Sequence, residues 1–181
     1  MDLLLIIFLV IVSLVLFLVA ILIEIFWGVY PFLFWGAIYV PTTDENVEQM
    51  ISFLEIKPGQ KIADLGAGNG KLVIAASKMG AEAHGYEINP FLVYRGRKKI
   101  RELGLQGKAF MHYKNLWHQD CRSFDAVAIY AMKHMMKGLE KKFERELKPG
   151  ARIASNYFVF PNWKPEKSEK RVHLYFKKLD K

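Results

Sequence analysis

The chain begins with one long apolar stretch. Residues 3–23 form a run of 21 in which Ser13 is the only polar side chain. At a rise of ~1.5 Å per residue, a helix of this length spans about 31 Å and matches a hydrocarbon core of ~30 Å. Because backbone groups must satisfy one another in lipid, we expect a transmembrane helix over residues 1–24. A cleaved signal peptide fits less well, since no basic residue precedes the run and no small-residue cleavage site follows.

Residues 25–40 remain apolar but differ in character. Gly28, Pro31 and Gly36 are expected to interrupt the helix. Four aromatic side chains suit the membrane–water interface, where a ring is buried and its polar group is hydrated: Trp27, Tyr30, Trp35 and Tyr39. We interpret the segment as an interfacial or kinked linker. The alternative is a second, tightly packed membrane segment.

From residue 41 onwards, short apolar strands alternate with amphipathic helical spacings. Thr42 and Glu45 form a capping-box pattern before a first helix, and Asn89-Pro90 is typical of the start of another. Strands are predicted at 61–64, 81–87, 108–113, 124–130, 151–158 and 172–177. Further helices are predicted between the first two strands as far as about residue 79, from 90 to 103 and from 132 to 147. Strands that alternate with helices favour a parallel sheet with right-handed crossovers, so we expect a compact doubly wound α/β domain over residues 41–181.

Charge separates the two regions. Residues 1–40 contain no Lys or Arg, so all 26 basic residues lie in 41–181 with 18 − 2 = 16 acidic ones, which gives +10. The positive-inside rule therefore predicts a single-pass membrane protein with a cytoplasmic C-terminal domain. An apolar fraction of 52% excludes global disorder, and the lone Cys121 excludes an internal disulfide framework. The five histidines show no metal-ligand spacing, so surface positions and no metal are expected.

The informative motif is the stretch Ala-Asp-Leu-Gly-Ala-Gly-Asn-Gly at 63–70, between the first strand and the next helix. Glycines let the backbone approach a ligand, and a helix N-terminus offers free N–H donors. A phosphate P-loop is excluded because Leu65 stands where its first glycine belongs. A dinucleotide fingerprint is excluded because Lys71 stands where its third glycine belongs.

An acidic residue two positions before Gly66-x-Gly68-x-Gly70 resembles the cofactor loop of class I S-adenosylmethionine-dependent methyltransferases. A carboxylate at Asp64 suits the ammonium group of that cofactor, and its charge suits the cationic sulfonium. Glu87 ends the second predicted strand, where an acidic side chain can accept hydrogen bonds from both ribose hydroxyls.

Further segments resemble a narrower family. YVPTTDENVEQM, DLGAGNGKLVIAA, YEINPFLV, NLW, LEKKFERELKPGARI and FPNWKP occur in this order. They are similar to the small membrane-anchored protein-lysine methyltransferases related to the ATP synthase c-subunit and adenine nucleotide translocase lysine methyltransferases, over residues 35–165. The resemblance implies a segment 39–42, including Thr42, that folds over the cofactor. It also implies that Gly66 and Gly68 line the methionine end, Glu87 the ribose, and Asn115 and Leu116 the adenine.

The resemblance further implies N-methylation of a lysine on a membrane-associated protein, with S-adenosylmethionine as cofactor. A dedicated catalytic base is not required, and Tyr130 and Trp163 are the candidate substrate contacts. A basic tail can hold anionic lipid headgroups of the bilayer. The net charge of +10 is also compatible with binding to RNA, so an RNA methyltransferase is an alternative. Nucleic acid is nevertheless not the expected partner, because the fourth strand does not end in the Asn/Asp-Pro-Pro-Tyr/Phe pattern. A lipid or quinone methyltransferase and a non-catalytic cofactor-binding scaffold also stay open.

Overall fold

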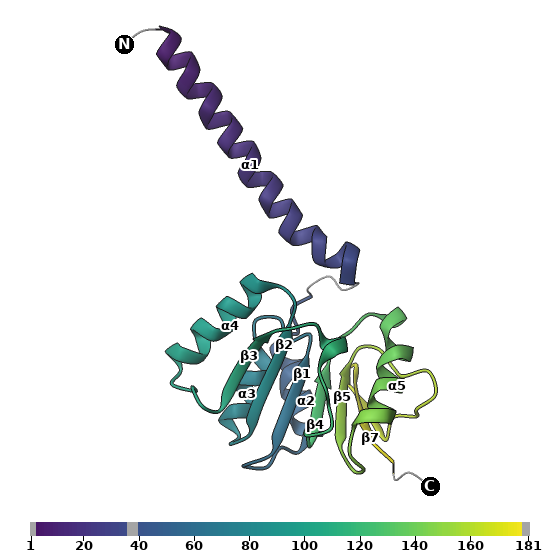
Figure 1. Cartoon of the computed structure of the whole chain (residues 1–181). Helices are drawn as coiled ribbons and strands as arrows, with labels where there is room; N and C mark the ends of the chain where they lie inside the picture. Colours follow the sequence, from purple (N-terminus) through teal and green to yellow (C-terminus); the bar gives the residue numbers. More distant parts are fainter. Residues whose placement is uncertain (1–2, 36–39, 179–181) are drawn as a thin grey trace. The chain divides into compact units, whose positions relative to one another are not determined.

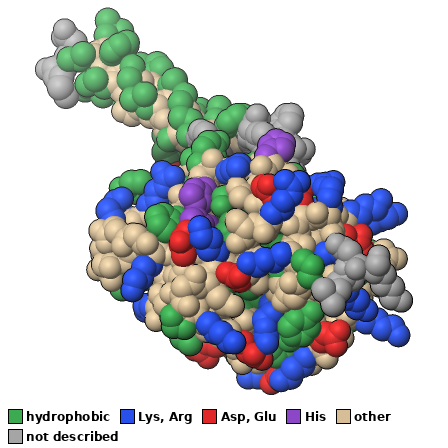
Figure 2. All heavy atoms as spheres, turned by 60° about the horizontal axis from the view of Figure 1, so that its bottom comes forward, with side chains coloured by type: hydrophobic (Ala, Val, Ile, Leu, Met, Phe, Trp, Pro, Cys, Tyr) green, Lys and Arg blue, Asp and Glu red, His purple; other side chains and the backbone are tan. Residues whose placement is uncertain are grey.

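The structure is a computed structural model that describes the backbone of residues 3–35 and 40–178 and the side chains of residues 3–26 and 40–178 (Figure 1). It separates into two units, Met1–Ile38 and Tyr39–Lys181. Figure 2 shows how they differ in surface chemistry. Apolar side chains cover the helical unit, whereas basic and acidic side chains are spread over the visible face of the globular unit.

The helical unit is one α-helix, α1 (Leu3–Trp35). Leu3–Phe26 is the one described helical segment long and apolar enough to cross a membrane, and none of it is buried. The expectation that Gly28 and Pro31 interrupt the helix is wrong, whereas Gly36 lies outside the described residues. A proline removes one backbone hydrogen bond, and the apolar helix on either side continues across it. The side chains expected at the interface lie outside the described residues, so the 1–24 and 25–40 division stays a prediction.

The globular unit is built on a seven-stranded sheet in the order β3-β2-β1-β4-β5-β7-β6. The strands are β1 (Lys61–Leu65), β2 (Glu82–Glu87), β3 (Ala109–Tyr113), β4 (Ala126–Ile129), β5 (Arg152–Asn156), β6 (Lys167–Glu169) and β7 (Val172–Phe176). The helices are α2 (Asp44–Leu54), α3 (Lys71–Lys78), α4 (Pro90–Glu102) and α5 (Met136–Glu146), with short 3-10 turns η1 (Leu116–His118) and η2 (Lys133–Met135).

The first five strands are parallel, as the sequence pattern predicts. The last two depart from it, because β7 runs antiparallel to β5 and β6 pairs with β7 as a hairpin. Lys170 and Arg171 connect them with φ of 48° and 67°, the left-handed geometry of a tight hairpin turn. Neither residue is a Gly, Asn or Asp, so the local residues carry no turn signal, and β6 lies in the stretch expected to be a basic tail.

Helices cover both faces of the sheet. Met50 of α2, Val73 of α3 and Ile100 of α4 belong to one buried core with Ile62 and Met111 of the sheet. Figure 1 shows α5 on the opposite side of the sheet, over β5 and β7. Its Phe143 packs edge-on against the ring of Phe160, which follows β5. This layering leaves the carboxyl ends of β1, β2 and β4 to form a site.

Helix starts confirm part of the capping prediction. Asn89 accepts hydrogen bonds from Phe91 and Leu92 N–H, and Pro90 is the first residue of α4. For α2, however, the cap is Thr43, whose hydroxyl accepts from Asn46 N–H. The capping-box pattern predicts Thr42 in this role, and Thr42 lies one residue before the cap.

Candidate active site

The carboxyl ends of β1, β2 and β4 meet at one edge of the sheet. Leu65 of β1 lies in register with Tyr86 of β2 and with Ile129 of β4. After β1 the chain bends across the end of β2, where Gly66 and Ala67 N–H both donate to the Tyr86 carbonyl at 2.9 and 3.1 Å. The loop between β1 and α3, residues 66–70, is called the glycine loop below.

Two glycines in this loop are required by its geometry. Gly66 has φ of 87° and Gly70 has φ of 82°, a region that side chains disfavour. A Cβ at Gly70 would also lie 3.0 Å from the sulfur of Met111. Gly70 precedes α3 without a side-chain cap, so the N–H groups of the first helical turn face the loop without a competing side-chain acceptor.

Glu87 holds the loop in place. Its Oε2 accepts from Gly68 N–H at 2.9 Å, and its Oε1 accepts from Ile88 and Asn89 N–H at 2.8 Å each. The side chain is only 8% exposed. The sequence placed Glu87 near the glycine loop but did not reveal these three bonds. The carboxylate is therefore fixed in one orientation before any ligand arrives.

Asp64 is the second buried carboxylate of the site and contrasts with Glu87. No hydrogen bond or ion pair joins its side chain to another described residue, and it is 8% exposed. Burial raises the pKa of Asp64 from 3.8 to about 7, and the negative charge of Glu87 adds to the rise. A cation bound here would restore the ionised form. The residues present therefore fit a ligand that carries an ammonium group.

The segment before α2 is tied to the same edge. Lys71 Nζ, at the start of α3, donates to the Thr42 carbonyl at 3.3 Å and pairs with Asp44 at 2.7 Å. Asn46 donates to the side-chain oxygen of Asn156 at 3.0 Å, which joins α2 to the end of β5. The structure thus brings Thr42 beside the helix that follows the glycine loop.

Asn115 and Leu116 lie in the loop after β3. Asn115 Oδ1 accepts from Trp117 N–H at 3.0 Å and caps η1, and both side chains are half-buried. The backbone N–H of Lys114 donates to the Glu87 carbonyl, which fixes the loop to the end of β2. Sequence reasoning missed that α5 also holds this loop. Lys142, 4% exposed, donates to the Trp117 and Gln119 carbonyls and pairs with Glu146.

Of the two candidate substrate contacts, the structure brings Tyr130 to the glycine loop. A Cβ at Gly66 would lie 3.9 Å from the Tyr130 carbonyl oxygen. Trp163 is held elsewhere, since its backbone N–H donates to Glu140 at 2.6 Å and its indole N–H to Glu144 at 2.9 Å. Both acceptors lie beyond the first turn of α5, which leads away from the carboxyl edge. Among the described residues, no contact joins Trp163 to the glycine loop.

Three histidines, His84, His112 and His173, are half-buried, which contradicts the expectation of surface positions. His84 and His112 are half-buried on neighbouring strands, and their ring nitrogens lie 3.0 Å apart. Residues that alternate along adjacent strands share a face of the sheet, so the two rings stack. The buried Cys121 is a small filler whose thiol pKa is raised to about 12, chiefly by burial. Among the described side chains, residues 3–26 and 40–178, no group of three or more His, Cys, Asp or Glu is placed to hold a metal ion.

The sheet order, the glycine loop after β1 and the acidic residue that ends β2 define a Rossmann-like methyltransferase domain. This agrees with the predicted fold class. An RNA methyltransferase from Salinibacter ruber, solved in complex with S-adenosyl-L-homocysteine, superposes with a TM-score of 0.75 at 26% identity. The match covers 78% of this chain and 95% of that one.

The chain belongs to the family of the ANTKMT methyltransferase domain, whose family model matches residues 64–167. It is 39% identical over 128 residues to the ATP synthase c-subunit lysine N-methyltransferase of Rattus norvegicus, a match that covers 71% of this chain and 59% of the relative. It is 37% identical to the adenine nucleotide translocase lysine N-methyltransferase of Mus musculus, over 70% of this chain and 56% of the relative. The chain therefore spans less than two thirds of these relatives. A protein-lysine N-methyltransferase of Saccharolobus islandicus is 30% identical, with 81% of its length matched.

Proposed function

We propose that this chain is an S-adenosylmethionine-dependent methyltransferase that modifies a lysine of a membrane-associated protein. The observation that carries the proposal is the pairing, at one sheet edge, of the fixed Glu87 carboxylate with the unpartnered Asp64 carboxylate beside the glycine loop. The lysine acceptor is supported by the relatives, several of which are named lysine N-methyltransferases.

Each site residue has a proposed role toward the cofactor. Asp64 holds the ammonium group, and Glu87 accepts a hydrogen bond from a ribose hydroxyl through the one lone-pair site, of about four, that its three N–H donors leave free. Gly66 and Gly68 line the methionine end. The adenine lies against Leu116 and the amide of Asn115, and Thr42 covers the cofactor from the segment that Lys71 tethers.

Methyl transfer to a lysine requires a neutral amine and its alignment with the methyl group. When bound, S-adenosylmethionine supplies an electrophilic methyl group on a sulfonium. A lysine must lose its proton to attack, which at pH 7 costs roughly 4–5 kcal/mol from a free pKa of ~10.4. Removing the amine from water lowers that cost. Tyr130, half-buried beside Gly66, orients the amine for an in-line approach, so positioning is its main contribution.

The decisive experiment incubates the full chain with methyl-labelled S-adenosylmethionine and with membrane and soluble fractions separately. We expect label on a lysine of a membrane protein. Label on RNA would favour the second candidate, an RNA methyltransferase, which the likeness to the Salinibacter ruber enzyme supports. Label on lipid or quinone would favour a third candidate, a lipid or quinone methyltransferase. Calorimetric binding of the cofactor without any labelled product would favour a non-catalytic scaffold.

The proposed location is the membrane, with a single pass and a cytoplasmic globular unit. The apolar Leu3–Phe26 segment supports the anchor, and the confinement of all basic residues to 41–181 supports the orientation. Protease added to intact cells should spare the globular unit. Digestion from outside would contradict the orientation, and release from membranes by high salt alone would contradict the anchor.

A further inference from the structure

Exposed apolar side chains of the globular unit gather at one edge. Within residues 40–178, nine large apolar or aromatic side chains are at least 36% exposed. Met79 and Leu103 follow the ends of α3 and α4, at the amino ends of the strands. The other seven, which include all five of the exposed aromatic ones, lie at the carboxyl ends: Val40, Phe91, Tyr94, Tyr113, Trp117, Tyr157 and Val159. This set is called the aromatic edge below.

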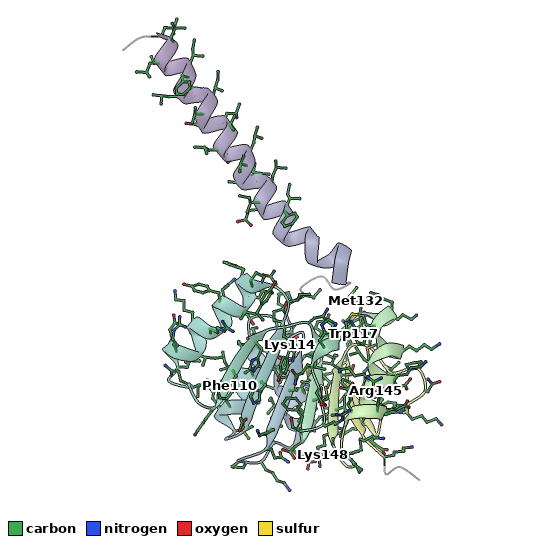
Figure 3. All side chains as sticks on the ribbon, viewed as in Figure 1. Phe110, Lys114, Trp117, Met132, Arg145 and Lys148 are labelled. Carbon is green, nitrogen blue, oxygen red and sulfur yellow. The ribbon has the colours of Figure 1, made fainter. Side chains whose placement is uncertain are left out.

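Topology explains why these residues share an edge. Tyr113 ends β3, Trp117 lies in the loop after it, and Tyr157 follows β5. Figure 3 shows Lys114, Trp117 and Met132 toward one end of the sheet and Lys148, which precedes β5, at the other. The carboxyl ends of parallel strands lie at the same edge, so segments far apart in sequence combine into one surface.

Packing within the fold accounts for Trp117, whose ring lies against Gly138 of α5, but not for the exposed rings of α4. The inward face of α4 carries Leu92, Val93 and Ile100, which are buried. Phe91 and Tyr94 point outward and are 62% and 59% exposed. Each ring leaves apolar surface in contact with water, which is unfavourable compared with a polar side chain at the same place. Exposed aromatic rings that play no part in the core, and that share an edge with further exposed rings, are typical of an interaction site.

Basic side chains lie beside the aromatic ones at the carboxyl edge. The Arg95 guanidinium lies over the Phe91 ring at 5.8 Å. Two further exposed basic residues, Lys114 and Lys133, follow the carboxyl ends of β3 and β4. The remaining basic residues of α4 lie toward its other end, where Lys98 and Lys99 pair with Glu102. An edge that carries exposed aromatic and basic side chains is suited to the interface of an anionic bilayer.

We propose that the aromatic edge is a membrane-docking surface that rests in the headgroup layer of an anionic bilayer. The same chain carries an apolar segment long enough to span a membrane, and Val40, on this edge, follows the last residue of α1 by only five positions. A lipid interface therefore suits this surface better than a soluble partner. Docking does not depend on the proposed function. If both hold, the glycine loop opens toward the headgroup layer, and an acceptor lysine must reach the site there.

The test places one environment-sensitive fluorophore on an introduced cysteine in the full chain. Tyr94→Cys probes the aromatic edge, and Met79→Cys is the matched control, 51% exposed at the opposite edge. Cys121 is fully buried with a raised thiol pKa, so labelling at pH 7 is confined to the introduced site. The proteins are reconstituted into phosphatidylcholine vesicles with phosphatidylglycerol, with and without a lipid that carries a headgroup quencher.

We expect a blue-shifted emission and strong quenching at position 94 and neither at position 79. We also expect the quenching at 94 to weaken when phosphatidylglycerol is omitted. Equal quenching at both positions, or none at 94, would overturn the proposal. So would a blue shift at 94 that appears only after a membrane-protein acceptor is added, because the surface would then belong to a protein partner. Cofactor binding, measured on the same samples, reports separately on the proposed function.

Discussion

At the scale of single residues, the fold changes the chemistry of Asp64 most. The residue lies at the end of β1 as one acid in a short motif, and its environment makes it a carboxyl group that titrates near neutrality. Glu87 lies close enough to add to this rise, yet its own oxygens are occupied by three backbone N–H groups. One carboxylate is thus free to receive a cation while the other shapes the loop.

The first prediction concerns the pH dependence of cofactor binding. Because the pKa of Asp64 is about 7 in the free protein, only part of the population carries the charge that attracts an ammonium group at pH 6. Affinity for S-adenosylmethionine should rise between pH 5.5 and 7.5, a range in which an α-amino group of pKa ~7.7–8 remains largely protonated. Asp64→Asn should weaken binding at pH 7.5 by ~1.5–3 kcal/mol and flatten the profile in calorimetry. A profile of unchanged slope in Asp64→Asn would contradict the assignment.

The second prediction concerns stability without cofactor. The folded-state pKa of Asp64 is raised above its unfolded value of 3.8, so the stability it contributes is fully present below pH 3.8 and is lost as pH rises toward 7. The Asp64→Asn variant should therefore have the melting temperature of the wild type near pH 4 and a higher one at pH 8. The gain in its free energy of unfolding at pH 8 is at most about 4 kcal/mol. Thermal melts at the two pH values check this. An equal difference at both would show that Asp64 is not the group responsible.

The third prediction separates Glu87 from an ordinary acid. In Glu87→Gln the amide must turn its NH₂ toward at least one of the three backbone N–H donors, so one hydrogen bond becomes a donor–donor conflict. We expect a loss of stability of ~1–3 kcal/mol together with weaker cofactor binding. Glu102→Gln, at the exposed end of α4, is the control and should change stability by less than about 0.5 kcal/mol. Similar effects of the two substitutions in denaturant titrations would refute the special role of Glu87.

At the scale of elements, the segment before α2 and the start of α3 form a connected pair. The Lys71 contacts to Thr42 and Asp44 are exposed, so they contribute little to overall stability but hold the segment near the glycine loop. A contact of this kind affects how long a ligand stays bound more than how stably the domain folds.

The fourth prediction follows from this pair. Lys71→Met should leave the free energy of unfolding within about 0.5 kcal/mol of the wild type and should speed cofactor dissociation. Lys78→Met is the matched control, because Lys78 is exposed on the same helix at its far end. Stopped-flow displacement by excess S-adenosylhomocysteine measures the rates. If the two variants dissociate alike, the segment does not cover the cofactor.

At the scale of the whole molecule, the apolar helix and the globular unit are distinct in composition and in packing. The sheet has its own core, and every residue proposed to hold the cofactor lies within Tyr39–Lys181. The proposed membrane anchoring would restrict the encounters of this unit to acceptors near the membrane and raise their effective concentration.

The fifth prediction removes the helix. A chain that begins at residue 37 should bind S-adenosylmethionine with the affinity of the full chain, because no cofactor residue is lost. It should methylate a soluble peptide that contains the acceptor lysine as before, and lose much of its activity toward the same lysine in a membrane-embedded protein. Methyl transfer to both substrates is measured side by side. Full activity toward the embedded protein would show that the anchor does not direct substrate choice.

The sequence by itself determined the features that depend on local spacing. An apolar run of membrane length, the alternation of β1 to β5 with helices and the glycine loop between Asp64 and α3 are written in neighbouring residues. Their periods and turn residues reflect how a short segment meets water, lipid or a sheet. The predicted strands accordingly agree with the observed ones to within a few residues.

Only the tertiary structure decided the features that join distant segments. The β6–β7 hairpin and the antiparallel β5–β7 pairing, the three bonds to Glu87 and the attachment of Trp163 to α5 each bring together residues without a shared local signal. The same holds for the near-neutral pKa of Asp64 and for the aromatic edge, because burial and a common edge are properties of the assembled sheet. Spacing along a chain sets periodicity, whereas desolvation and long-range pairing depend on which segments pack against one another.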